Sequence, residues 1–331
     1  MGQEVDLSTQ LAGLRLPNPV MTASGCAAAG RELQQFFDVA ELGAVVTKSV
    51  MRAVRSGRPT PRMAETASGM LNSIGLQGPG IDAFIANDLP WLRSVGARAV
   101  VSIAGGDVAE FRELAQRLGD QPGVCAVEVN ISCPNVANRG LVFACEPASS
   151  AAVISAVRAV LPQRIPVLAK LSPDVTDIVQ IASACVDAGA DGLTMVNTLL
   201  GMSIDLDRLR PKLASRTGGL SGPAIRPVAV RCIWQVYAAM QAGLLTQVPI
   251  VGVGGVRSGG DALELVLAGA SAVQVGTAIF NDPCAPIRVR DELAHELALR
   301  GIARFTDAVG RAHATPAPLT PAHTTPAPLD L

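Results

Sequence analysis

The sequence contains very few histidines, and this limits the chemistry that it can perform. Only three of its 331 residues are histidine. His313 and His323 belong to a low-complexity stretch near the C-terminus, which leaves His295 alone in the rest of the chain. One histidine makes neither a histidine-ligated zinc site nor a Ser-His-Asp triad. Any base must therefore be a cysteine, lysine, aspartate or glutamate, and we expect no metal site.

Other familiar signals are also missing. The seven cysteines show no Cys-x-x-Cys or ferredoxin-like spacing, and no Gly-x-Gly-x-x-Gly dinucleotide fingerprint is present. No window approaches the roughly 18 apolar residues of a membrane span. The N-terminus lacks the charged and apolar regions of a secretory signal. We therefore expect a cytoplasmic protein without an iron–sulfur cluster of its own.

The sequence contains few lysines, and most of its positive charge is on arginine. Lys and Arg together number 27 against 28 Asp and Glu, so there is no basic field for nucleic acid or an anionic membrane, and a small-molecule ligand is expected. Only Lys48, Lys170 and Lys212 are lysines. The first two end apolar runs, 44–48 and 166–170. A compact ammonium at the carboxyl end of a strand suits an anionic ligand or an electron-rich ring.

Strand-like apolar runs alternate with windows of helical spacing along most of the chain. This pattern predicts an α/β fold, a (β/α)8 TIM barrel, in preference to an open sheet. The predicted strands are 20–22, 44–48, 99–103, 127–131, 167–171, 192–196, 250–253 and 272–275. The predicted helices are 31–42, 108–118, 148–160, 178–188, 228–241, 260–268 and 287–299.

Three further segments complete the predicted architecture. Val5–Leu7 and Leu14–Leu16, with Gly13 between them, predict an N-terminal β-hairpin that caps the bottom of the barrel. Segments 50–89 and 201–223 are expected to be inserted loops on the site face. We expect one barrel over residues 1–310, followed by a disordered Pro/Ala/Thr-rich tail over residues 311–331.

The stretch Val127 to Asn135 is the first candidate for chemistry. An apolar strand ends there in Asn130, Ser132, Cys133, Pro134 and Asn135. Proline cannot continue a strand ladder, so these polar side chains stand at the strand's carboxyl end, where barrel proteins place their ligands. A cysteine among amides and a hydroxyl is better suited to chemistry than to core packing.

Glycine turns end the last two predicted strands. Gly254-Gly255 follows Ile250–Val253, and Gly276-Thr277 follows Ala272–Val275. Such turns let backbone N–H groups approach a phosphate, and the phosphate of flavin mononucleotide (FMN) is the expected occupant. Asn72, Asn130, Asn135 and Asn197 are predicted to converge on the same face. Amides of this kind suit a small planar ring with amide groups and a carboxylate.

Over residues 5–310 the chain resembles the class 1 dihydroorotate dehydrogenases, most closely the class 1B catalytic subunit. The motifs that carry the resemblance include Ala23-Ser24-Gly25-Cys26, Thr47-Lys48-Ser49, Asn72-Ser73-Ile74-Gly75-Leu76, Asn130-Ile131-Ser132-Cys133-Pro134-Asn135, Ala169-Lys170-Leu171-Ser172-Pro173, Asn197-Thr198-Leu199 and Thr217-Gly218-Gly219-Leu220-Ser221-Gly222-Pro223. One departure is Ser102, where class 1B relatives often carry asparagine and class 1A relatives serine.

The resemblance implies a role for each of these residues. Cys133 is the catalytic base that takes a proton from dihydroorotate. FMN is held by Ser24, Lys48, Ser49, Ser102, Asn130, Lys170, Val196, Gly222, Gly254, Gly255, Gly276 and Thr277. Dihydroorotate is held by Lys48, Asn72, Ser73, Ile74, Gly75, Leu76, Asn130, Asn197 and Thr198.

The resemblance also implies partners. A class 1B enzyme passes electrons to a second subunit that carries FAD and an iron–sulfur cluster, and from there to NAD⁺, around a homodimeric core. A class 1A enzyme uses fumarate instead. Two alternatives remain at this point: an FMN-dependent enzyme acting on a related dihydropyrimidine, and a non-catalytic barrel that binds a phosphate ligand. The last of these predicts a colourless protein.

Overall fold

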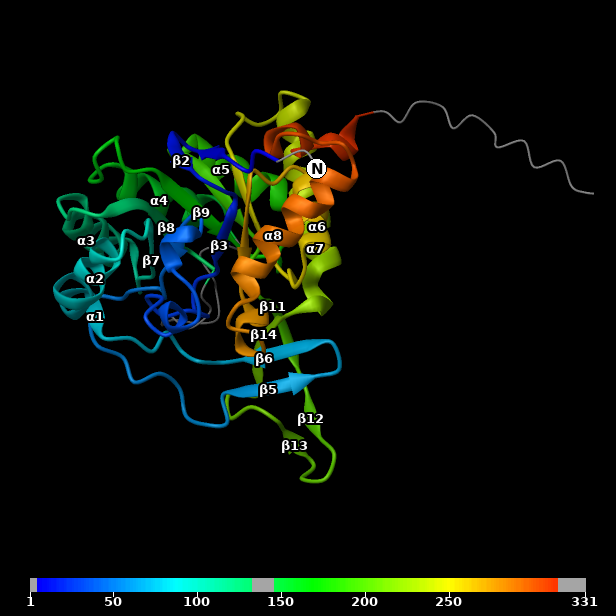
Figure 1. Cartoon of the computed structure of the whole chain (residues 1–331). Helices are drawn as coiled ribbons and strands as arrows, with labels where there is room; N and C mark the ends of the chain where they lie inside the picture. Colours follow the sequence, from blue (N-terminus) through cyan, green and yellow to red (C-terminus); the bar gives the residue numbers. More distant parts are fainter. Residues whose placement is uncertain (1–4, 133–145, 315–331) are drawn as a thin grey trace, which may run out of the picture.

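The computed structural model describes residues 5–132 and 146–314, and its centre is a barrel of eight parallel strands (Figure 1). In spatial order these are β3, β16, β15, β10, β9, β8, β7 and β4. A parallel bridge between Met21 and Ala44 joins the two end strands and closes the barrel, so the predicted (β/α)8 fold is confirmed. The strand bounds are β3 (Val20–Thr22), β4 (Val45–Val46), β7 (Ala99–Ile103), β8 (Val124–Asn130), β9 (Val167–Leu171), β10 (Gly192–Met195), β15 (Ile250–Val253) and β16 (Ala272–Val275).

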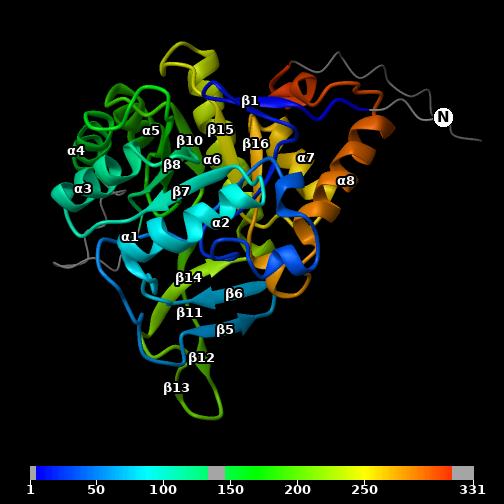
Figure 2. The ribbon, with the colours of Figure 1, turned by 60° about the vertical axis from the view of Figure 1, so that its left-hand side comes forward.

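Helices surround the strands on the outside (Figure 2). Six of the seven predicted helices are present, with ends displaced by at most two residues from those expected. They are α3 (Val108–Gly119), α4 (Pro147–Arg158), α5 (Ile178–Asp187), α6 (Arg226–Gln241), α7 (Gly259–Leu267) and α8 (Ala285–Leu299). A further group lies before β7, comprising α1 (Gly80–Ala83), the π-helical turn η3 (Phe84–Asp88) and α2 (Leu89–Ser94).

The helix predicted over residues 31–42 is wrong. Two short 3₁₀ turns occupy this segment, η1 (Leu33–Gln35) and η2 (Val39–Glu41). Asp38 between them has an extended backbone, with φ −70° and ψ 110°, and its carboxylate accepts a hydrogen bond from the N–H of Ala40. A side chain that satisfies the start of a new turn in this way competes with a continuous helix.

An apolar plug fills the amino-terminal end of the barrel. The predicted hairpin is present, but its first strand is β1 (Thr9–Leu11) and not Val5–Leu7, and it pairs with β2 (Leu14–Leu16) through an Ala12-Gly13 turn with positive φ at both residues. Leu11 and Leu16 are buried against barrel residues of the lower layer. These barrel residues are Met21, Ala44, Val46, Val100, Ala126, Leu168, Val251 and Ala272.

The side chain of Thr22 completes the seam between β3 and β4. Its hydroxyl donates to the carbonyl of Val46 at 3.1 Å and accepts from the N–H of Val46 at 2.9 Å. The neighbouring amides of Val45 and Thr47 point the other way and bond to Arg98 and Val100. The hydroxyl therefore supplies hydrogen bonds that a strand partner would otherwise give to Val46.

The two inserted segments lie on the site face, as expected, and contribute the strands of a second sheet. Their strands are β5 (Met63–Thr66), β6 (Gly69–Asn72), β11 (Leu199–Met202) and β14 (Thr217–Ser221), in the antiparallel order β11-β14-β6-β5. In the register, Gly219 lies opposite Asn72. This sheet lies at the opposite end of the barrel from the plug (Figure 1). A small hairpin of β12 (Ile204–Asp205) and β13 (Arg210–Pro211) extends beyond it.

The first residues assigned to the tail belong to the folded part of the chain. After η7 (Phe305–Ala308), a turn η8 (Arg311–His313) brings His313 onto α6, where its ring stacks on Trp234 with centroids 3.5 Å apart. A ring nitrogen of His313 also lies 3.0 Å from the carbonyl oxygen of Ala268. The rest of the predicted tail, residues 315–331, lies outside the described residues, and its disorder stays a prediction.

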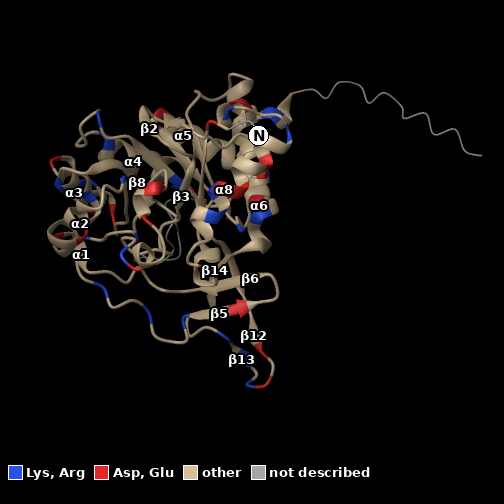
Figure 3. Cartoon of the chain, viewed as in Figure 1, with Lys and Arg blue, Asp and Glu red and all other residues tan. Residues whose placement is uncertain are grey.

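Lys and Arg residues and Asp and Glu residues are both spread over many elements of the chain in Figure 3. Within the described part of the chain, no helix combines the length and apolarity needed to cross a bilayer.

Candidate active site

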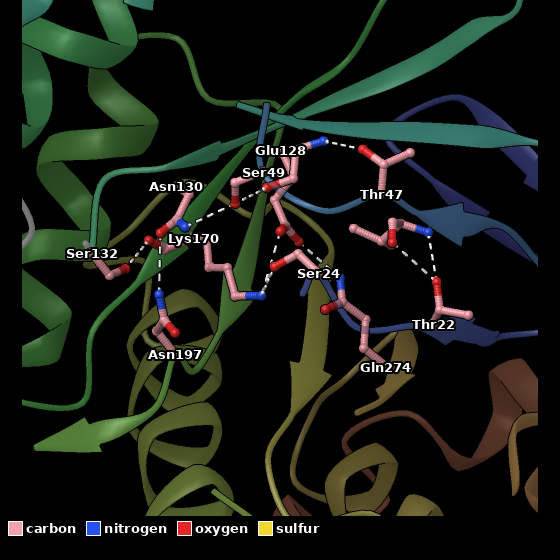
Figure 4. A network of polar contacts seen from close by, with 12 residues as sticks. Thr22, Ser24, Thr47, Ser49, Glu128, Asn130, Ser132, Lys170, Asn197 and Gln274 are labelled. Atoms are coloured by element: carbon pink, nitrogen blue, oxygen red, sulfur yellow. Dashed lines mark hydrogen bonds and ion pairs between the residues drawn. The ribbon is translucent and has the colours of Figure 1, made fainter. Parts of the chain in front are cut away.

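Above the apolar plug, towards the carboxyl ends of the barrel strands, lies a layer of polar side chains. Figure 4 shows the contacts among these side chains. Side chains two residues apart on a strand share a face. Glu128 on β8, Lys170 on β9 and Gln274 on β16 each lie two residues after a barrel residue that packs against the plug. They are 0%, 4% and 1% exposed, respectively. A carboxylate, an ammonium and an amide thus meet inside the barrel.

Lys170 is held from two sides. Its Nζ donates to Ser24 Oγ at 2.9 Å and lies 3.4 Å from Glu128 Oε1. The other carboxylate oxygen of Glu128 accepts a hydrogen bond from Gln274 Nε2 at 2.8 Å. The ammonium is therefore fixed between the core of the barrel and the loop that follows β3, as Figure 4 shows.

A chain of hydrogen bonds joins the ends of four strands. Asn197 Nδ2 donates to Asn130 Oδ1 at 3.1 Å, and Asn130 Nδ2 donates to Ser49 Oγ at the same distance. The hydroxyls of Ser49 and Ser102 lie 2.9 Å apart. The structure thus brings together four residues that the sequence analysis singled out separately.

The second lysine of the site lies beside the same loop. A Cβ placed on Gly25 would stand 3.4 Å from Lys48 Nζ, so the ammonium of Lys48 rests against the backbone next to Ser24. Burial raises the pKa of the neighbouring Cys26 thiol to about 11, while the charges of Lys170 and Lys48 act in the opposite direction. Two ammonium groups and one buried carboxylate therefore lie around this end of the barrel, which suits an anionic ligand.

The glycine turns after β15 and β16 lie in close contact with neighbouring segments of the chain. Gly254 and Gly255 have φ values of 134° and 78°, and a Cβ on Gly255 would lie 2.6 Å from Arg226 Cβ. After β16, a Cβ on Gly276 would lie 3.1 Å from Ala23 Cβ. These positions accept only glycine without rearrangement.

The turn after β16 also contacts the end of the second sheet. Thr277 Oγ1 lies 2.8 Å from Ser221 Oγ, which connects the turn after β16 to β14. The next residue, Gly222, has a φ of 86°. Val196, the residue directly after β10, is buried. Its N–H donates to the carbonyl of Val253 at 2.8 Å.

The Asn72 to Leu76 segment meets the end of β10 through Gly219. Asn72 Nδ2 donates to the carbonyl of Gly219 at 3.2 Å, and Thr198 Oγ1 occupies the space that a Cβ on the same glycine would need. Ser73 Oγ is bonded to Ser215 at 2.6 Å. Ile74 contributes its carbonyl, which accepts from the N–H of Arg58, and Gly75 and Leu76 have φ values of 81° and 57°. The second sheet thereby connects two groups of predicted substrate residues.

Cys133 and Asn135 lie outside the described residues. Ser132, directly before Cys133, is described: its Oγ donates to the carbonyl of Lys170 at 2.6 Å, which ties the end of β8 to β9. Among the described residues no group of three or more His, Cys, Asp or Glu side chains could hold a metal ion.

Sequence reasoning missed the buried partners of the predicted residues. Glu128 and Gln274 received no role, although each stands between two valines in an otherwise apolar strand. A charged or amide side chain in a strand buried on both faces is a usable signal, because such a group needs a partner there. Ser221, which contacts Thr277, carried no comparable signal.

Comparison with known proteins agrees with the resemblance seen in the sequence. The family model described as "Dihydroorotate dehydrogenase" matches residues 6–297. A protein of Geobacter sulfurreducens named "Dihydroorotate dehydrogenase B (NAD(+)), catalytic subunit" is 49% identical over 308 residues, which cover 93% of this chain and 98% of the relative. A protein of the same name from Trichlorobacter lovleyi is 51% identical over 304 residues, covering 92% and 97%.

A solved structure gives the same result. The crystal structure of DHODH from Eimeria tenella in complex with ferulenol superposes with a TM-score of 0.77 at 26% sequence identity, over 94% of this chain and 89% of that one. The barrel, its polar layer and the match over most of its length lead to one conclusion: the chain belongs to the dihydroorotate dehydrogenase family.

Proposed function

We propose that this chain is the catalytic subunit of an NAD⁺-linked dihydroorotate dehydrogenase, which oxidises (S)-dihydroorotate to orotate in the biosynthesis of UMP. The observation that carries the proposal is the hydrogen-bonded set of Asn197, Asn130, Ser49 and Ser102 at the carboxyl end of the barrel, where Lys170 is also held through its bond to Ser24. These are residues to which the family resemblance gives roles, and relatives near 50% identity carry this name.

FMN is the cofactor that we propose for this site. At the glycine turns after β15 and β16 a Cβ would meet neighbouring protein atoms, so glycine fits there and leaves the backbone N–H groups of both turns without a side chain of their own residue, as phosphate binding needs. Inside the barrel, Thr194 Oγ1 and Gln274 Oε1 are buried without a hydrogen-bond partner among the described residues, so polar groups of a ligand would have partners there. The residues that would hold it are Ser24, Lys48, Ser49, Ser102, Asn130, Lys170, Val196, Gly222, Gly254, Gly255, Gly276 and Thr277. When bound, FMN supplies the acceptor for the hydride that leaves C6 of dihydroorotate.

The substrate residues suit a planar ring with amides and a carboxylate. Lys48 would bind the carboxylate of dihydroorotate, since its ammonium lies at the rim of the site. The amides of Asn130 and Asn197 are oriented by their mutual hydrogen bond and by Ser49. Each NH₂ group has a second N–H that these bonds do not use, and that N–H can donate to a carbonyl oxygen of the ring. Asn72 and Thr198, joined through Gly219, would close the other side together with Ser73, Ile74, Gly75 and Leu76.

Cys133 is proposed as the base that takes the proton from C5. A cysteine accepts a proton only as the thiolate, and nearby cations favour that form. Lys48 and Lys170 supply positive charge at this end of the barrel, and Ser132 anchors the chain immediately before Cys133 to the backbone of β9. The histidine-poor composition is consistent with a base of this type.

The partners follow from the same proposal. The names of the relatives include "NAD(+)" and "catalytic subunit". We propose that electrons leave this chain for a separate subunit that carries FAD and an iron–sulfur cluster, in the cytoplasm, and that two copies of the barrel form the core of the assembly. Exposed apolar side chains in the β12–β13 hairpin, among them Leu206 at 80% and Leu209 at 84% exposed, give a surface on which such contacts can form.

The visible spectrum of the purified chain tests this function directly. We expect a yellow protein whose flavin absorbance is bleached by dihydroorotate under anaerobic conditions and is restored by neither NAD⁺ nor fumarate alone. Restoration by fumarate would instead indicate a class 1A enzyme. Orotate should compete with dihydroorotate more strongly than uracil does, and the reverse order would indicate a different dihydropyrimidine substrate. A colourless protein would contradict the proposal.

The variant Cys133→Ser tests the assignment of the base. A serine hydroxyl is a far weaker acid than a thiol, so this variant should bind FMN and orotate normally but lose most turnover, with the remaining activity moved to higher pH. Cys284→Ser is the matched control, because Cys284 is exposed and has no proposed role in the site. Wild-type turnover by Cys133→Ser would show that another group takes the proton.

A further inference from the structure

Glu128 is a carboxylate in an unusual place for a side chain without a role. It is fully buried inside the barrel, directly above the apolar plug, and its two oxygens face Lys170 Nζ at 3.4 Å and Gln274 Nε2 at 2.8 Å. Removing a carboxylate from water costs several kcal/mol unless its partners compensate, and apolar residues of similar size fill such positions at least as well. Stability alone therefore gives a weak reason for a glutamate here.

We propose that Glu128 is a positioning residue of the active site: with Gln274 behind it, Glu128 fixes the ammonium of Lys170 beside Ser24 and sets the net charge that the barrel presents to the bound flavin. This inference rests on the FMN-dependent activity proposed above and deepens it.

The first part of the role is geometric. A lysine side chain has four rotatable methylene groups, so one contact does not define where its ammonium lies. Here Glu128 holds Nζ from inside the barrel and Ser24 holds it at the rim, at 3.4 Å and 2.9 Å. These two contacts use two of the three N–H donors of the ammonium and leave the third for a ligand.

The second part of the role is electrostatic. Lys170 and Lys48 bring two positive charges to this end of the barrel, and Glu128 brings one negative charge. A reduced flavin carries more negative charge than the oxidised one, so uncompensated cations favour reduction. By offsetting Lys170, Glu128 makes the reduced flavin a better electron donor. An enzyme needs this property when its electrons continue to NAD⁺, because the NAD⁺/NADH couple has a low reduction potential.

The Gln274 amide gives the carboxylate its orientation. Its N–H donates to Glu128, while its own oxygen has no partner among the described residues. The described contact of the Gln274 amide is therefore the hydrogen bond that it donates to the Glu128 carboxylate. An apolar residue at position 274 would leave Glu128 with Lys170 as its single described partner.

The midpoint potential of the bound flavin tests the proposal, measured by reductive dye titration of the flavin-loaded protein. In Glu128→Gln the shape of the side chain is kept and the negative charge is removed. At a fixed solution potential the ratio of reduced to oxidised flavin should rise at least tenfold, which corresponds to about 30 mV for a two-electron couple. Glu113→Gln, the same substitution at a half-exposed position on α3, should leave the ratio unchanged.

Glu128→Asp separates charge from shape. It keeps the charge but withdraws it from Lys170, so the ratio should rise by less than in Glu128→Gln, while kcat falls because the ammonium is less well fixed. If Glu128→Gln does not retain flavin, Glu128→Asp carries the test, and a ratio equal to that of the wild type overturns the proposal. An unchanged ratio in flavin-loaded Glu128→Gln overturns it as well.

The titration uses no dihydroorotate, so the two proposals can fail separately. A wild-type protein that binds no flavin would contradict the proposed function. A flavin-loaded protein with unchanged potential in Glu128→Gln would contradict only the role of Glu128.

Discussion

The seam of the barrel offers a stability prediction that depends on one hydroxyl. Replacing Thr22 by valine keeps the shape of the side chain and removes the oxygen that both donates to and accepts from Val46. The N–H and C=O of Val46 face β3 in a part of the barrel with no solvent access, since Thr22 and Val46 are both 0% exposed. Both backbone groups would lose the partner that the side chain provides.

The expected cost follows from these two groups. A buried donor or acceptor left without a partner costs about 1–3 kcal/mol. Two such groups, offset in part by the greater apolarity of valine, should lower the free energy of unfolding of Thr22→Val by about 2–4 kcal/mol. The loss should appear mainly as a lower denaturation midpoint, because the surface exposed on unfolding is nearly the same.

Urea unfolding followed by circular dichroism measures this difference, and the barrel supplies a matched control. Thr194 on β10 is also 0% exposed, but its hydroxyl has no hydrogen-bond partner in the described part of the chain. Thr194→Val therefore removes no hydrogen bond of that kind and should change the stability by less than about 1 kcal/mol. Equal losses in the two variants would refute the reasoning, since burial alone would then explain both.

Two other predictions concern cysteine chemistry and the C-terminal turn. With its pKa raised to about 11, Cys26 should remain unmodified by iodoacetamide at pH 8 while exposed Cys284 reacts, as peptide mapping by mass spectrometry will measure. Because the pKa is raised on folding, the stability that Cys26 contributes should be complete below about pH 9 and fall as the pH rises through 11; labelling of Cys26 at the rate of Cys284 would contradict both statements. His313→Ala should lower the free energy of unfolding by about 1–2 kcal/mol, because it loses the stacking on Trp234 and the contact with the carbonyl of Ala268, and an unchanged urea midpoint would disprove this.

The barrel strands were predictable because each leaves a strong local signal. Ala99–Ile103 and Val167–Leu171 are runs of five buried residues, and the structure has them with the predicted bounds. A strand buried on both faces needs no alternation, so a short apolar run flanked by polar residues or glycine is sufficient to locate it. The residues that follow these strands could then be assigned to one face of the barrel.

The parts that sequence did not predict depend on contacts between distant segments. The apolar spacing in residues 31–42 resembles a helix, but the Asp38 carboxylate stabilises a separate turn. The second sheet pairs Asn72 with Gly219, and no local pattern in either segment names the other as its partner. Glu128 was overlooked for a similar reason, since its importance comes from Lys170 and Gln274 on two other strands.

The pairing of β6 with β14 has a consequence for how the chain acquires its site during synthesis. The bond between Asn72 and Gly219 joins residues 147 positions apart. At a translation rate of about 5–20 residues per second, the outer edge of β6 stays unpaired for roughly 7–30 s before β14 leaves the ribosome. A nascent chain that ends before residue 217 already contains six of the eight barrel strands, but Asn72 and Thr198 have no Gly219 to bring them together. The pairing of β6 with β14 therefore cannot form until residue 219 has been synthesised, and until then the unpaired edge of β6 is open to wrong pairing.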